Sequence, residues 1–148
     1  MNLVKSFKQY NNNNVLFFEP IKNNIMVDGI FIRIVYSTEN MTLNGIYLSV
    51  DLMDITCEKY YNKYKCCFNI FNHTHIIENL KLIEEELLKK YKTNKLPFFK
   101  IYNQLKCGYI KLFTSVTRKP VNSFTLKISG IWETAYNYGL TYKFIPVN

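Results

Sequence analysis

The 148-residue sequence is poor in residues that break or cross-link a chain, with five Gly, four Pro and four Cys. This scarcity, together with 48% hydrophobic residues, argues against a fibrous, flexible or disordered protein. No apolar run approaches the roughly 18 residues that a membrane-spanning helix needs, so no membrane partner is expected. The first residues also lack the apolar core of a secretory signal. We therefore expect one intracellular domain, large enough to bury a sizeable core.

The cysteines do not form a metal-binding pattern. Cys57, Cys66, Cys67 and Cys107 lack the spacing of metal ligands. As neighbours in an expected strand, Cys66 and Cys67 point to opposite faces, which suits neither a metal clamp nor a mutual disulfide. We expect all four to be reduced and mostly structural.

Motifs of catalysis are absent as well, since the sequence has no glycine-rich phosphate loop and no nucleophile motif. His73 and His75 have no Cys nearby at ligand spacing, which argues against zinc. Asp51, Asp54 and Glu58 are better interpreted as solvated surface than as a nuclease-like site. We predict a non-enzymatic protein with no cofactor and no metal.

Acidic residues are missing from Lys89 to Lys127, a segment with ten basic residues, and the net charge of the chain is +8. Lysine outnumbers arginine 17 to 2 and asparagine is abundant, as an AT-rich genome would produce. That bias does not explain a long segment without acids. The segment is typical of proteins that bind polyanions.

Alternation of apolar and polar residues predicts most of the fold. We expect strands at about 15–18, 29–36, 45–52, 63–71 and 109–113, and a closing pair within 124–144. One apolar stripe at three- and four-residue steps predicts a helix at about 75–92, and residues 98–107 suggest a short second helix. The acidic run 84–86 is expected to be exposed and to pair with Lys89 and Lys90.

Apart from the short edge strand at 15–18, the order of these elements is three strands, a helix, and two or three further strands. This is the order of an OB-fold, so we predict a mainly β protein with an OB-fold-like barrel of five to six strands. One amphipathic helix would lie between strands three and four. Residues 1–14 would be a polar N-terminal arm, and 15–148 a single OB-fold-like domain.

The polar side of the expected strands combines positive charge with aromatic rings, as single-stranded nucleic acid requires. A basic turn at Arg118 and Lys119 would flank the same groove. An ordinary solvated sheet face is the competing interpretation of this pattern. The predicted interface consists of Arg33, Tyr47, Lys65, Tyr109, Lys111, Arg118, Lys119, Lys127, Lys143 and Trp132.

Trp132 is the one tryptophan, and its position is open at this stage. It shares strand parity with the apolar residues Leu126 and Ile128, which favours a place in the core. A bulge at Gly130 would instead turn it towards the ligand. We prefer the core and keep Trp132 as a candidate contact.

Two segments of the sequence resemble a known group of proteins. Ile128-Ser-Gly-Ile-Trp-Glu-Thr134 followed by Tyr138-Gly-Leu-Thr-Tyr-Lys-Phe144 resembles the C-terminal signature of small proteins from large DNA viruses of eukaryotes. Ile34-Val-Tyr-Ser-Thr38 with Thr42-Leu-Asn-Gly-Ile-Tyr47 resembles their N-terminal half. The resemblance implies an OB-fold single-stranded-DNA-binding protein similar to those of podophages. Such phage proteins carry an acidic C-terminal tail, whereas this chain ends Ile145-Pro-Val-Asn148, so recruitment of partners through a tail is not expected.

The leading hypothesis is therefore single-stranded DNA binding in viral replication, repair or recombination, in the cytoplasm or nucleus of a host. RNA as the ligand, a homodimer, and viral replication proteins as partners are left open. The alternative is a structural or protein-interaction module, such as a virion component or an assembly adaptor. In that case the basic face would meet an acidic protein.

Overall fold

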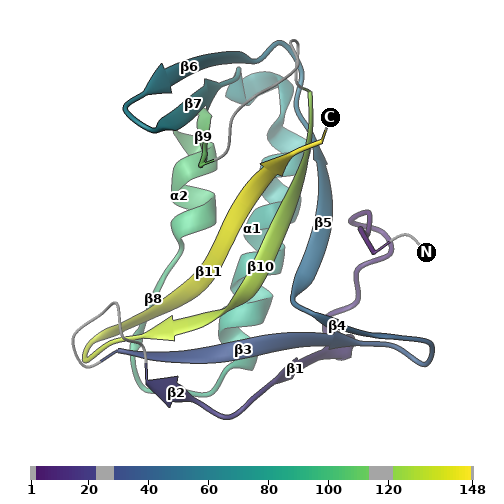
Figure 1. The fold of residues 1–148 in the computed structure, drawn as a ribbon, viewed down its shortest axis with the longest axis vertical. Helices are drawn as coiled ribbons and strands as arrows, with labels where there is room; N and C mark the ends of the chain where they lie inside the picture. Colours follow the sequence, from purple (N-terminus) through teal and green to yellow (C-terminus); the bar gives the residue numbers. More distant parts are fainter. Residues whose placement is uncertain (1–2, 23–28, 114–121, 148) are drawn as a thin grey trace.

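The computed structural model describes residues 3–22, 29–113 and 122–147 (Figure 1). Its largest sheet is built on the antiparallel hairpin of β10 (Ser123–Glu133) and β11 (Asn137–Pro146). The other edge of β10 has two partners in succession: β5 (Ile46–Asp51) pairs with its first half and β3 (Ile30–Ser37) with its last four residues. The expected C-terminal hairpin is confirmed, and it lies in the middle of the sheet.

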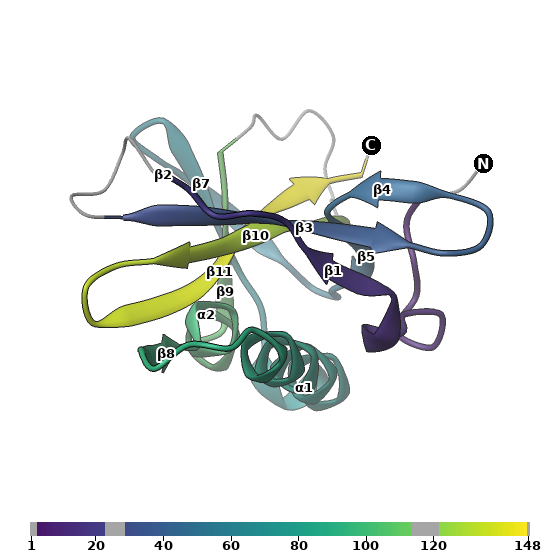
Figure 2. The same cartoon turned by 90° about the horizontal axis from the view of Figure 1, so that it is seen from below.

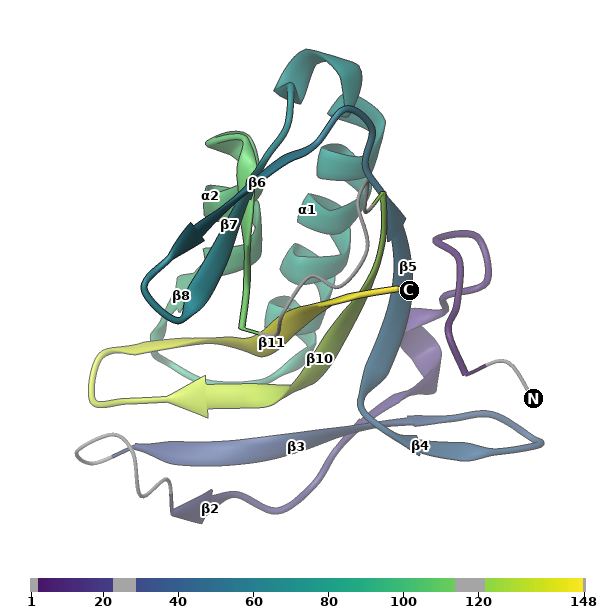
Figure 3. The same ribbon diagram turned by 45° about the horizontal axis from the view of Figure 1, so that its top comes forward.

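Four short strands extend this sheet. β1 (Val15–Phe17), β2 (Ile21–Lys22) and β4 (Thr42–Asn44) pair with β3, and β8 (Leu96–Phe98) runs parallel to the start of β11. The sheet curls into half a barrel (Figure 3).

A second, smaller sheet has the order β6-β7-β9, with β6 at Thr56–Tyr60, β7 at Lys63–Cys67 and β9 at Tyr109–Leu112. β9 lies against β11, but no ladder joins the two sheets among the described strands. The mainly β class is confirmed, and the sheets form a half-barrel with a separate small sheet. Sequence reasoning missed β6 because it reads as polar, and none of its residues is fully buried.

Two α-helices, α1 (Thr74–Lys90) and α2 (Lys100–Lys106), pack together on one face of the large sheet (Figure 2). Both confirm the expected helices. We call this side of the sheet the helix face and the opposite side the open face. Each fully buried Leu or Ile on the helix face contributes about 1.5–3 kcal/mol relative to an exposed one. The buried apolar stripe of α1 comprises Ile77, Leu80, Ile83, Leu87 and Leu88.

The expectation that Glu84 is exposed is wrong. Its side chain is 0% exposed, and its two carboxylate oxygens accept hydrogen bonds from the backbone N–H groups of Ile101 and Tyr102, both at 2.9 Å. These N–H groups belong to the first turn of α2 and have no partner within that helix. Glu84 therefore fixes the start of α2 to the middle of α1.

The preference for Trp132 in the core is also wrong. The register of β10 against β11 shifts between Ile128 and Gly130, so the strand contains a bulge at Ser129. Before the bulge the even-numbered residues of β10 face the helices, and after it the odd-numbered residues do. Ile131 is therefore 0% exposed, whereas Trp132 is half-buried on the open face. The alternation that placed Trp132 with Ile128 does not continue through the bulge.

Glycines allow this arrangement because rings and backbone lie close to them. A Cβ on Gly130 would collide with the Ile32 carbonyl oxygen and the Phe31 ring, and a Cβ on Gly139 would lie 2.7 Å from the Trp132 ring. Trp132 is the register partner of both Phe31 and Gly139. The tryptophan thus covers the glycine of the neighbouring strand.

The expectation of reduced cysteines is wrong for one pair. Cys57 of β6 and Cys66 of β7 are direct cross-strand partners and are joined by a disulfide. Cys67 and Cys107 are free and exposed. The pairing was missed because β6 itself was not expected.

The segment 3–14 packs against the domain. Lys5 forms a parallel bridge to Leu48 on the outer edge of β5, and the Tyr10 ring stacks on Tyr36 at 5.8 Å. The Lys90 Nζ donates to the backbone carbonyl of Asn12, in the short 3-10 helix η1 (Asn12–Asn14), at 2.7 Å. Within the described residues, no helix combines the length and hydropathy needed to cross a membrane.

Candidate functional site

Three predicted site residues form a row across the open face. Tyr47 of β5 is the register partner of Lys127 on β10, and Lys127 is the partner of Lys143 on β11. Directly paired residues of antiparallel strands project from the same face, so the three side chains are neighbours. The Lys127 Nζ lies 5.6 Å from the centre of the Tyr47 ring.

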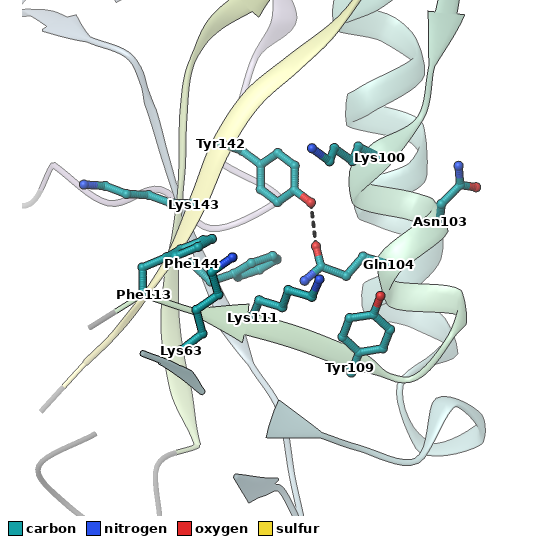
Figure 4. Close-up of a pocket in the computed structure, with 10 residues that line it drawn as sticks. All are labelled: Lys63, Lys100, Asn103, Gln104, Tyr109, Lys111, Phe113, Tyr142, Lys143 and Phe144. Carbon is teal, nitrogen blue, oxygen red and sulfur yellow. Dashed lines mark hydrogen bonds between the residues drawn. The ribbon is translucent and has the colours of Figure 1, made fainter. Parts of the chain in front are cut away.

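A cleft lies where this row ends, between β11, the small sheet and α2 (Figure 4). Its volume is about 360 Å³, within the usual range of small-ligand sites. Among the described residues, the lining contains four lysines and four aromatic rings, with no acidic residue. The lining residues are Lys63, Lys100, Asn103, Gln104, Tyr109, Lys111, Phe113, Tyr142, Lys143 and Phe144.

The small sheet contributes lysines that lie over aromatic rings. The Nζ atoms of Lys65 and Lys111 are 4.7 and 5.9 Å from the centre of the Tyr109 ring. The Lys63 Nζ lies 5.1 Å from the centre of the Phe113 ring. Contacts of this kind stabilise by about 0.5–1 kcal/mol at exposed sites and help to hold each ammonium group above a ring.

Lys143 connects the two parts, because it belongs to the row and also lines the cleft. We call the combined surface the basic track. It consists of Tyr47, Lys127 and Lys143 on the large sheet, Lys63, Lys65, Tyr109, Lys111 and Phe113 on or beside the small sheet, and Lys100, Gln104 and Tyr142 at the back of the cleft.

Two pairs of lysines in the basic track are directly opposed. Lys127 pairs with Lys143, and Lys65 pairs with Lys111. Opposite charges at directly paired positions stabilise a sheet by about 0.2–1 kcal/mol, and like charges at the same positions destabilise it. None of these four lysines forms an ion pair with a carboxylate among the described residues. Lys65 also faces Glu58, its register partner on β6, whereas Lys127 and Lys143 have no acidic register partner on the described strands, so the repulsion between Lys127 and Lys143 is uncompensated there.

At the back of the cleft, the Tyr142 hydroxyl donates a hydrogen bond to Oε1 of Gln104 at 2.5 Å. Burial raises the pKa of Tyr142 well above its usual value, and the charges of Glu84 and Tyr109 raise it further. The hydroxyl therefore stays protonated and remains a donor. Gln104 and Lys100 both lie on α2, whose start is held by Glu84.

Arg33 and Trp132 lie beyond the basic track, towards the hairpin end of the open face. Arg33 is the partner of Gly130, in the row next to Lys127 and Lys143, and Trp132 is one row further on.

The Arg33 guanidinium lies 6.0 Å from the centre of the Phe18 ring, and both line a separate pocket of about 450 Å³. The Trp132 ring lies 6.4 Å from the Phe98 ring. Phe18 and Phe98 are exposed, and the pocket beside Arg33 also contains Glu19, so this part of the sheet is largely apolar with charges of both signs.

Of the ten predicted site residues, the structure brings six into the basic track: Tyr47, Lys65, Tyr109, Lys111, Lys127 and Lys143. Arg118 and Lys119 lie outside the described residues. The predicted interface omitted Lys63 and Phe113, although both lie within the expected strands and share strand parity with Lys65 and Lys111. The α2 residues Lys100 and Gln104 carried no such signal, because their position depends on how the helix docks.

The histidine that was weighed as a zinc ligand is structural. His73 is 3% exposed, its Nε2 accepts from the backbone N–H of Met53 at 2.8 Å, and its Nδ1 lies 2.6 Å from the carbonyl oxygen of Asn69. It joins the loop after β5 to the 3-10 helix η2 (Ile70–Asn72). No group of three or more candidate metal ligands occurs in the described part of the chain.

Comparison of the chain with protein-family models, with curated proteins and with solved structures found no match.

Proposed function

We propose that the protein binds single-stranded DNA along the basic track. The observation that carries this proposal is two directly opposed lysine pairs, Lys127 with Lys143 and Lys65 with Lys111, beside a cleft whose described lining contains no acidic residue. A phosphate between two such lysines would turn a repulsion into two attractions. A chain of phosphates is the ligand that satisfies both pairs at once.

Aromatic rings in the same track supply the second requirement of single-strand binding. Tyr47, Tyr109 and Phe113 alternate with the lysines, and bases stack on such rings for about 1–3 kcal/mol each, whatever the base. Lysines hold the phosphates, while the rings hold the bases. Arg118 and Lys119 remain proposed contacts, because they lie outside the described residues.

The resemblance noted in the sequence gives this activity a setting. We propose an OB-fold-like domain, with the curled sheet and the small sheet as its two parts, that acts in viral DNA replication, repair or recombination inside the host cell. RNA in place of DNA is compatible with the same chemistry. The proposed function needs no cofactor and no enzymatic step.

The test is a titration with a labelled oligothymidylate and with a matching duplex at several salt concentrations. We expect the single strand to bind more tightly, with log affinity falling against log salt by about 0.7 per phosphate contact, or about 3.5 for five contacts. Binding that does not depend on salt, or a preference for the duplex, would contradict the proposal.

A protein-interaction module is the second candidate, and a different observation favours it. Ile21, Leu96, Phe18 and Phe98 are exposed apolar residues at the end of the sheet that carries Trp132. Sedimentation of the free protein at rising concentration tests this role for a second copy of the chain. A monomer at all concentrations would argue against self-association through this end.

A further inference from the structure

We propose that the cleft is a base-reading subsite that prefers keto bases, thymine or uracil and guanine, to amino bases. This inference rests on the proposed function and adds a base preference to it. Its basis is the hydrogen-bonding character of the cleft, where most of the polar groups that line it are donors and the Gln104 carbonyl oxygen already accepts one hydrogen bond.

Gln104 is the central residue, because its amide has a defined orientation. The Tyr142 hydroxyl donates to Oε1, so this oxygen is engaged and the amide NH₂ is directed to the other side. The side chains of Gln104 and Lys111 both line the cleft (Figure 4). No described residue accepts a hydrogen bond from the Gln104 amide NH₂ or from the Lys111 ammonium group.

The remaining polar groups of the cleft are also mainly donors. Lys63 and Lys100 carry ammonium groups, and a lysine has no acceptor. Asn103 could supply an acceptor, but its side chain points away from the other residues (Figure 4). The exceptions are two hydroxyl groups: Tyr109 can donate or accept, and the Tyr142 oxygen can still accept, since its proton is given to Gln104. The cleft therefore matches a ligand edge that is rich in acceptors.

Nucleobases differ in this respect at their exocyclic groups. Thymine presents the O4 acceptor where cytosine presents the N4 amino donor, and guanine presents O6 and N7 where adenine presents N7 and an amino group. An amino group placed against Gln104 and Lys111 would meet two donors and lose its hydrogen bond to water. A keto oxygen would accept from both.

The test compares oligothymidylate, oligodeoxyuridylate and oligodeoxycytidylate of equal length at one salt concentration and mildly alkaline pH. These pyrimidines are of similar size and differ at the exocyclic group and at N3, which is a donor in thymine and uracil and an acceptor in cytosine. The uracil oligomer controls for the methyl group of thymine. We expect the thymine and uracil oligomers to bind about five- to tenfold more tightly than the cytosine oligomer.

Variants separate base reading from phosphate binding. Gln104→Ala should bring the ratio of thymine to cytosine affinity to about one. Gln104→Glu, which replaces the donor by an acceptor, should weaken all binding and lower the ratio below one. Asn103→Ala is the matched control on the same helix and should keep the wild-type ratio. Circular dichroism checks that each variant is folded.

Three results would overturn the inference. The first is a wild-type ratio within twofold of one, and the second is an unchanged ratio in Gln104→Ala. Either of these, with salt-dependent binding intact, removes the base preference and leaves the proposed function standing. The third is absence of single-strand binding, which removes both.

Discussion

Replacing Glu84 with glutamine tests how the start of α2 is held in place. The Glu84 carboxylate is fully buried between the two helices and accepts two backbone hydrogen bonds from α2. Burial is the largest influence and raises the pKa of this carboxyl from 4.5 to about 7, although the two N–H groups act in the opposite direction. The folded protein therefore binds the Glu84 proton more tightly than the unfolded chain does.

The sign of the pH effect follows from that difference. Tighter binding of the proton by Glu84 in the folded state adds to the free energy of unfolding. This contribution is fully present below about pH 4.5 and is lost as the pH rises through about 7. A rise in pKa from 4.5 to about 7 corresponds to about 3 kcal/mol, at 1.36 kcal/mol per pKa unit. The wild-type free energy of unfolding should carry a component of this size that decreases with pH.

Urea denaturation between about pH 4 and pH 8 measures this component as the difference between wild type and Glu84→Gln. At about pH 4 the glutamine variant should be less stable than wild type, because its amide nitrogen cannot accept a hydrogen bond from the second N–H group of α2. The gap between the proteins should then narrow by about 3 kcal/mol as the pH rises. Glu78→Gln, at an exposed position of α1, is the control and should follow wild type. Parallel curves for wild type and Glu84→Gln would refute the reasoning.

Three further predictions concern the fold and the cysteines. Gly130→Ala places a Cβ against the Ile32 carbonyl oxygen, and we expect a loss of at least about 1–3 kcal/mol in urea denaturation; an unchanged midpoint would contradict the bulge geometry. Tyr138→Phe removes a buried hydrogen bond to the carbonyl oxygen of Leu88 and should cost about 1 kcal/mol or more in the same assay, whereas a stability gain would argue against that bond. Thiol titration of the native, unreduced protein should find Cys67 and Cys107 but neither Cys57 nor Cys66, and four reactive thiols would contradict the disulfide.

The sequence predicted the long strands and both helices because their apolar periodicity is strong. Leu48, Leu126 and Phe144 form one buried row across β5, β10 and β11, as their alternation indicated. Short and exposed elements left no such signal. β6 has no fully buried residue, and β8 contains Pro97 and is exposed throughout.

The candidate site was predicted in part, and the errors have local causes. Parity arguments hold within an unbroken strand, so Lys127 and Lys143 were placed on one face correctly. A single bulge at Ser129 reversed the parity of Trp132, and alternation alone cannot detect a bulge. Lys65 and Lys111 were also assigned to polar sides correctly, but they lie on a second sheet. Whether two strands share a sheet depends on tertiary pairing, which periodicity does not specify.

The two opposed lysine pairs lead to the most direct measurement. The slope of log affinity against log salt for an oligothymidylate should be compared between wild type, Lys111→Ala/Lys143→Ala and Lys89→Ala. Lys89 is exposed at the end of α1, away from the basic track, and serves as the control. We expect the double variant to lose about 1.4 from the slope, at about 0.7 per phosphate contact, and the control to keep the wild-type value. A double variant with the wild-type slope would contradict binding along the basic track.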